Sequence, residues 1–208
     1  MHPIPVQGPF FQVGINFVGP LPITERGNRY IIVAMDYLTK WPEVRPVSQA
    51  TAEMMASFIY EEIICRHGCP SRILTDRGSH FNNRMINGLM ERFTIKHLLS
   101  SSYHPQTNGL VERFNRTLCE ALTKLITHSN DWDKYIAPVL FAYRSSKQAT
   151  TKITPFYLTY GREARLLVDN LTEDFVTIQQ RIMGLVDDLP ILREIAKDTI
   201  TEAQSEQK

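Results

Sequence analysis

The sequence has few cysteines and no long apolar run, and both absences narrow the class of protein it can encode. Its 208 residues include only three cysteines, Cys65, Cys69 and Cys119, and no CxxC pair. An odd number of cysteines without a charged and apolar leader predicts an intracellular protein with reduced thiols and no membrane partner. His67 lies between Cys65 and Cys69, but no second ligand pair follows at zinc-finger spacing. We therefore interpret the cysteines as small buried hydrophobic residues.

A strong overall charge is also missing. The formal net charge is +1 at pH 7, which taken alone argues against a simple electrostatic DNA binder. The distribution is uneven, because residues 65–165 carry 15 Lys and Arg against 7 Asp and Glu, whereas residues 171–208 carry 4 against 8. The basic region suits a surface that meets phosphates, although basic stretches are often only solvated faces.

The apolar pattern predicts an α/β domain. Residues 10–18, 30–35 and 43–47 have the pattern of an antiparallel meander, and residues 71–75 and 94–99 that of two further strands connected by helices. After Asp169 the helical spacing predicts one or two acidic amphipathic helices, interrupted at Pro190. We therefore divide the chain into an extended lead-in (1–10), a core (11–168) and an acidic helical extension (169–208).

Two carboxylates stand out within the core. Asp76 follows the apolar run Ile73-Leu74-Thr75 at an expected strand end, and Glu112 opens an expected helix after thirty-five intervening residues. Folding can bring two such side chains together, where they would hold Mg²⁺ for phosphodiester chemistry. The alternatives are a turn aspartate that accepts backbone N–H groups and a first-turn glutamate stabilised by the helix dipole.

These two residues stand in a set of motifs that resembles the integrase core of gypsy-type LTR retrotransposons, in the retroviral integrase superfamily. The motifs are FVGPLP (17–22), YIIVAMDYLTKWPE (30–43), RHGCPSRILTDRGSHF (66–81), YHPQTNG (103–109), ERFNRTL (112–118) and TPFYLTYGREARL (154–166). The resemblance implies an RNase H-like fold, a five-stranded mixed sheet flanked by helices, here with the helical C-terminal extension. It also implies DNA integration by 3′-end processing and strand transfer, with two Mg²⁺ or Mn²⁺ ions.

The first of three catalytic carboxylates in this family lies in a DFVGP motif, which here begins with Asn16. The catalytic and metal-binding set is therefore Asn16, Asp76 and Glu112. A neutral amide offers one oxygen but no negative charge to bridge two cations, so we expect weak metal binding and impaired catalysis. Asp36 is the obvious substitute, but we interpret it as the cap of the turn through Thr39 and Lys40.

The polar loop before Glu112 and the helix after it are the expected DNA contacts. Amide and phenol groups bond phosphates and base edges, and Arg116 lies one helical turn beyond Glu112 on the same face. The expected contacts are Tyr103, Gln106, Asn108 and Arg116. The alternative for the loop is a polar surface segment, and Arg113 is expected to point off this face into solvent. The resemblance implies element ends and target DNA as partners, a homodimer or higher multimer, and action in the nucleus after cytoplasmic synthesis.

Two other functions stay open. The first is a catalytically dead integrase-like core that serves as a dimerisation or interaction module, which Asn16 favours. The second is another RNase H-like enzyme, such as a DNA transposase or hybrid nuclease, which YHPQTNG and FVGPLP disfavour. Integrases of this family are cut from longer polyproteins, and the sequence contains no HHCC zinc-ligand set. We therefore expect only partial reactions from these residues.

Overall fold

The computed structural model describes residues 7–100, 109–165 and 184–206. Its centre is a five-stranded mixed sheet with the order β3-β2-β1-β4-β5. Strands β1 (Gln12–Val18), β2 (Tyr30–Asp36) and β3 (Pro42–Val47) form an antiparallel meander. Strands β4 (Arg72–Thr75) and β5 (Lys96–Leu99) then add parallel to β1. The predicted five-stranded mixed sheet of an RNase H-like fold is confirmed.

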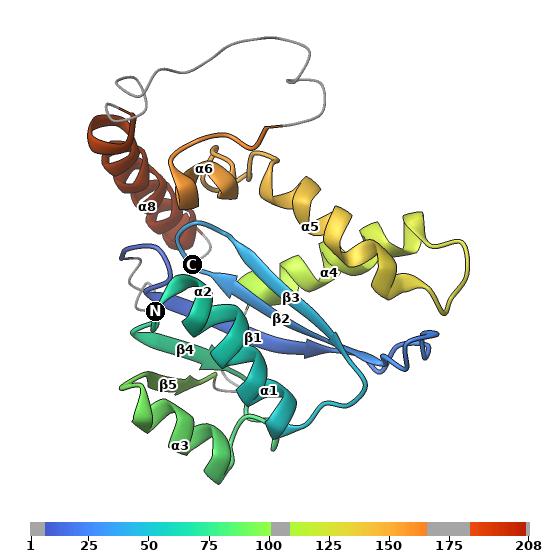
Figure 1. Ribbon diagram of the computed structural model, residues 1–208. Coiled ribbons are helices and arrows are strands. Elements are labelled where there is room, and N and C mark those ends of the chain that lie inside the picture. Colours follow the sequence, from blue (N-terminus) through green and yellow to red (C-terminus); the bar gives the residue numbers. More distant parts are fainter. Residues whose placement is uncertain (1–6, 101–108, 166–183, 207–208) are drawn as a thin grey trace.

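Helices cover both faces of the sheet (Figure 1). On one face lie α1 (Ala52–Phe58), the π-helical turn η1 (Ile59–Ile64), α2 (Cys65–His67) and α3 (Arg84–Arg92). On the other face lie α4 (Gly109–Leu125), the 3-10 turn η3 (Trp132–Tyr135) and α5 (Ile136–Arg144). Each face encloses its own cluster of buried apolar side chains, so the sheet separates two cores.

Strand β1 supplies both cores because its side chains alternate between the faces. Val13 and Ile15 point into the core under α1 and α3. Gly14 faces α4, and a β-carbon there would lie 2.7 Å from Val111 Cγ2 and 3.0 Å from Tyr37 Cε2. The missing side chain therefore lets the first turn of α4 lie directly on the sheet.

A buried carboxylate ties the edge strand β3 to two helices. Glu43 accepts hydrogen bonds from Trp41 Nε1 (3.0 Å), Arg66 (3.2 Å) and Arg144 (2.8 Å), and its Oε1 lies 2.9 Å from His67 Nε2. Arg144 also lies 4.2 Å over the ring of Trp41. These contacts fix the positions of α2 and α5 against β3. The other notable feature of this edge is a pair of prolines, Pro42 and Pro46, opposite Met35 and Ile31.

The acidic extension packs back onto the core. Its described part is the π-helical turn η5 (Gly184–Asp188) followed by α8 (Leu189–Glu206). Pro190 lies where the π-helical turn η5 passes directly into α8, so the expected interruption takes the form of a change of helix type. The expected boundary at residues 168 and 169 lies outside the described residues.

The short helix α6 (Pro155–Tyr160) is capped by Thr154 and ends at Gly161, which has a left-handed conformation. The expectation of buried cysteines is wrong, since Cys65 and Cys69 are exposed and Cys119 is half-buried. Helix α2 ends at Gly68, and it is His67 that turns inward, stacked 3.8 Å from the ring of Phe10.

None of the described helices has the length and apolar content of a membrane span.

Candidate active site

Asn16 lies in β1, and Asp76 is the residue that directly follows the adjacent strand β4. The parallel ladder of the two strands ends with Gly14 opposite Leu74, and continuing its register by two residues brings Asn16 level with Asp76. Asn16 shares the α4 face of β1 with Gly14 because side chains two residues apart point the same way. It is half-buried, and its Oδ1 accepts a hydrogen bond from the N–H of Phe17 at 2.8 Å.

Asp76 follows directly on β4 and begins a turn. Its Oδ1 accepts a hydrogen bond from Gly78 N at 2.7 Å, as the turn interpretation predicts. A β-carbon on Gly78 would lie only 2.9 Å from that oxygen, so glycine permits the tight turn. Because a carboxylate has two oxygens, this bond orients Asp76 and is compatible with a metal ligand.

Glu112 lies in the first turn of α4 and is exposed. It adjoins Val111, the residue that contacts Gly14, so the start of α4 lies over β1. Arg116 is also exposed, one turn beyond Glu112 on the same helix face. The predicted DNA contacts Tyr103, Gln106 and Asn108 lie outside the described residues.

Asp36 does not replace the carboxylate that Asn16 lacks. It is 1% exposed, and both of its oxygens accept hydrogen bonds within the protein. Oδ1 accepts from Phe10 N at 2.9 Å, and Oδ2 accepts from Thr39 N at 2.8 Å and Thr39 Oγ1 at 2.7 Å. Burial raises the pKa of this carboxyl group despite those bonds. The interpretation of Asp36 as a turn cap is therefore confirmed.

Two further polar residues near these positions were missed by the sequence analysis. Tyr37 is 4% exposed and packs against Gly14, and burial raises the pKa of its phenol, with the charge of Glu112 adding to the effect. Asn115 lies one turn after Glu112, and its buried Oδ1 has no hydrogen-bond partner among the described residues. The i, i+3 spacing from Glu112 is the signal that could have identified Asn115.

The donor atoms at these positions suit a hard divalent cation. Asp76 and Glu112 supply carboxylate oxygens, and Asn16 and Asn115 supply amide oxygens, which Mg²⁺ and Mn²⁺ accept. Within the described ranges no three His, Cys, Asp or Glu side chains gather as a metal-binding group. The residues therefore fit a divalent ion. Asp76 and Glu112 provide two negative charges, whereas a site with a third carboxylate in place of Asn16 would provide three.

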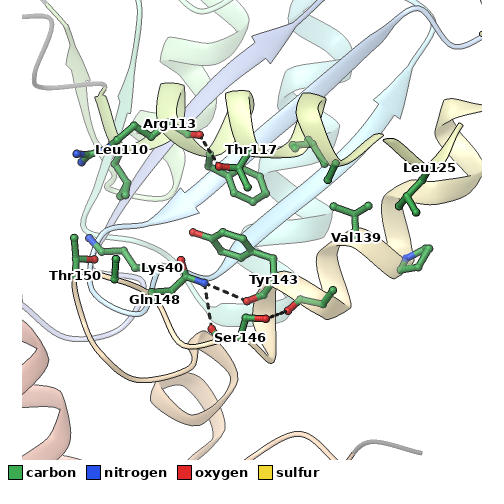
Figure 2. Close-up of a pocket in the computed structure, with 16 residues that line it drawn as sticks. Lys40, Leu110, Arg113, Thr117, Leu125, Val139, Tyr143, Ser146, Gln148 and Thr150 are labelled. Atoms are coloured by element: carbon green, nitrogen blue, oxygen red, sulfur yellow. Dashed lines mark hydrogen bonds between the residues drawn. The ribbon is translucent and has the colours of Figure 1, made fainter. Parts of the chain in front are cut away.

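A groove of about 720 Å³ runs between α4 and α5 (Figure 2). Apolar side chains form most of it, and the ammonium of Lys40 and the guanidinium of Arg113 lie together at one end. Arg113 is exposed, as expected, and borders this groove. Arg113 follows Glu112 in sequence, but its side chain lies on a different side of α4.

Comparison with known proteins identifies residues 13–105 with the family described as "Integrase core domain". The chain is 32% identical over 158 residues to the retrovirus-related Pol polyprotein from transposon 412 of Drosophila melanogaster, covering 76% of this chain and 13% of that protein. It is 37% identical over 137 residues to the Pol polyprotein of Feline endogenous virus ECE1, covering 65% of this chain and 13% of that protein. The chain thus spans about an eighth of these polyproteins.

Among solved structures, the chain resembles one in the simian T-cell lymphotropic virus intasome in complex with PP2A regulatory subunit B56 gamma. The TM-score is 0.66 at 17% identity, and the match covers 85% of this chain and 63% of that one. At this identity the match establishes the shared fold.

Proposed function

We propose, starting from the retroviral-type integrase core domain that this chain contains, that it is a polynucleotidyl transferase core for DNA integration. In this proposal it processes the 3′ ends of retrotransposon DNA and joins them to target DNA. The observation that supports the proposal is the parallel register of β1 with β4, which Asp76 directly follows, together with the packing of the first turn of α4, which contains Glu112, on β1. In this proposal two carboxylates and an amide meet at one end of the sheet.

The residues divide the work between them. Asp76 and Glu112 would hold the divalent ions, which when bound activate the attacking hydroxyl group and stabilise the leaving oxygen. The bond from Gly78 N holds the Asp76 carboxylate in one orientation, and the α4 backbone on β1 fixes the height of Glu112. Arg116 lies where its guanidinium would bind a phosphate next to these carboxylates. The chain's contribution is mainly positioning and electrostatics.

Asn16 lowers the activity of this arrangement in our proposal. Its amide has a single oxygen, and that oxygen already accepts a hydrogen bond from Phe17 N at 2.8 Å. A carboxylate at the same position would supply a second oxygen and a negative charge that attracts the cations. We therefore expect weak divalent-metal binding and slow chemistry in this chain.

DNA and further copies of the chain are the partners in this proposal. The fold is shared with a protein whose structure was solved in an intasome, and the basic residues are concentrated in residues 65–165. Tyr103, Gln106, Asn108 and Arg116 would contact the DNA, and the chain would act as a homodimer or higher multimer in the nucleus. The salt dependence of DNA binding tests the role of Arg116.

The experiment is a strand-transfer and disintegration assay with Mg²⁺ or Mn²⁺ on this chain and on Asn16→Asp. The substitution is expected to raise the rate roughly 100-fold or more, because even an outer partner of a metal ligand contributes 10–100-fold. Asn87→Asp is the matched control, since it adds the same charge at an exposed position of α3 on the opposite face. Equal stimulation by both variants would contradict a site-specific role for residue 16.

The second candidate is a catalytically dead core that works as an interaction module, and Asn16 is the observation that favours it. No strand transfer by either the chain or Asn16→Asp, with the fold intact, would support this candidate. Simple cleavage without strand-transfer products would instead indicate a transposase-like or hybrid nuclease activity.

A further inference from the structure

The groove between α4 and α5 has a chemically polar end and an apolar end. Phe114, Leu118 and Val139 form apolar walls, and Leu125, 49% exposed, lies at the end away from the two cations (Figure 2). Lys40 is 5% exposed and donates one hydrogen bond, to the carbonyl of Tyr37 at 2.8 Å. A volume of about 720 Å³ is in the range of true binding pockets. The groove therefore suits an occupant with apolar side chains followed by an acidic group.

Helix α8 presents such a sequence on its outer face. Its inner face is already occupied, since Ala196 and Ile200 pack against Leu38 and Leu158 and Arg193 donates to the carbonyl of Leu158 at 2.9 Å. The opposite face carries two exposed isoleucines, Ile191 (59%) and Ile195 (50%), followed at helical spacing by Asp198 and Glu202. Glu194 lies on the same face and bonds Lys197.

The two surfaces also match in length. From Ile191 to Glu202 is eleven helical residues, or about 16 Å, and from Arg113 to Leu125 is twelve, or about 18 Å. The outer face of α8 points away from the domain on which its inner face packs, so it is turned away from the groove of its own chain. The α8 helix that occupies the groove would therefore come from a second copy of the chain.

We propose that α8 of a second copy of this chain docks in the α4–α5 groove, with Ile191 and Ile195 between the apolar walls and Asp198 next to Arg113 and Lys40. The interface would bury two isoleucines that otherwise face water and would neutralise the cations at the end of the groove. The proposal rests on the multimeric assembly proposed above and identifies the surfaces that form it. It requires neither DNA nor metal.

The first test is sedimentation velocity of the whole chain over a wide concentration range. The chain is expected to self-associate, and the double variant Ile191→Glu/Ile195→Glu is expected to raise the dimer Kd at least roughly tenfold, as loss of a buried anchor does. Ile23→Glu is the matched control, because Ile23 is 60% exposed and belongs to neither surface. A chain that stays monomeric throughout, or a double variant that associates like the original, would overturn the proposal.

The second test exchanges charges between two copies. Asp198→Arg and Arg113→Glu are each expected to weaken self-association at least roughly tenfold, and a mixture of the two variants is expected to recover it between unlike copies. Circular dichroism confirms that each variant is folded. Association that neither variant weakens would place the interface elsewhere and contradict the proposal. Since no catalysis is measured, this result stays distinct from the outcome for the proposed function.

Discussion

Val111 occupies the space that a side chain on Gly14 would need, with its Cγ2 atom 2.7 Å from the ideal position of that β-carbon. The contact is direct, from α4 to the central strand of the sheet. Glu112 is the next residue of the helix, so the distance of its carboxylate from the sheet depends on residue 14 being a glycine.

Gly14→Ala is expected to lower stability by about 1–3 kcal/mol, because the added methyl group overpacks the contact with Val111. Urea unfolding measures this change. In the Asn16→Asp background the same substitution should also reduce metal-dependent activity, since it moves the first turn of α4. Gly88→Ala is the control, because a β-carbon there meets nothing within 4 Å and α3 should gain about 0.5–1 kcal/mol. Adding Val111→Ala to Gly14→Ala should relieve the overpacking, and a purely additive double variant would contradict this account.

Glu43→Gln is expected to destabilise the fold by about 3–5 kcal/mol at neutral pH, since it removes one partner from a buried charged cluster. Burial alone would raise the pKa of Glu43, but the bonds from His67 and Trp41 and the charges of Arg144 and Arg66 outweigh it and hold the pKa below 4.5. The stabilisation is therefore complete above pH 4.5 and is lost as the pH falls through the lowered pKa. Unfolding measured against pH should show this acid loss in the original chain and a smaller one in Glu43→Gln.

Lys40→Met is expected to stabilise the monomer near pH 7, because burial lowers the pKa of Lys40 to about 8 and the charged form is the costly one. Between pH 8 and 10.5 the unfolded chain holds a proton that the folded chain has released, so the stability of the original chain rises with pH there. The advantage of Lys40→Met should shrink over that interval by up to about 1.4 kcal/mol per pH unit. A constant difference between the two chains would show that Lys40 stays charged when buried.

Arg116→Ala is expected to weaken binding to duplex DNA of any sequence and to reduce the slope of log K against log salt by about 0.9. The reason is the loss of one phosphate contact next to the proposed metal ligands. Fluorescence anisotropy over a salt series gives both quantities. Arg92→Ala is the control, since Arg92 is exposed on α3 across the sheet. An unchanged slope would show that Arg116 makes no phosphate contact with the DNA.

The sheet was predictable because its signals are local. The apolar run from Tyr30 to Met35 and the alternation in β1 each follow from burial on one or both faces of a strand. The caps at Thr51 and Thr154 are local in the same sense, since each side chain accepts a hydrogen bond from the N–H group three residues further on. The register that brings Asn16 level with Asp76 depends in addition on the parallel pairing of β1 with β4, which joins segments far apart in the sequence.

The features that the sequence analysis missed depend on contacts between distant segments. Arg113 borders a groove only because α5 lies beside α4, and Gly14 is needed only because Val111 packs against it. At Pro190 the helix changes from π-type to α-type without a loop, and the sequence pattern does not distinguish such a change from a full break. The exposure of Cys65 and Cys69 depends on which way the chain turns at Gly68, and cysteine has no local signal for that choice.

Strand β3 forms one margin of the sheet, and two of its six residues, Pro42 and Pro46, have no amide hydrogen to offer an incoming strand. A further strand added at this edge would lack the two backbone hydrogen bonds that Pro42 and Pro46 cannot donate. Edge-to-edge aggregation and the addition of a strand from a neighbouring chain are therefore both disfavoured. If copies of this chain associate, the contact would therefore form through side-chain surfaces such as those of the helices, and not through backbone pairing at β3.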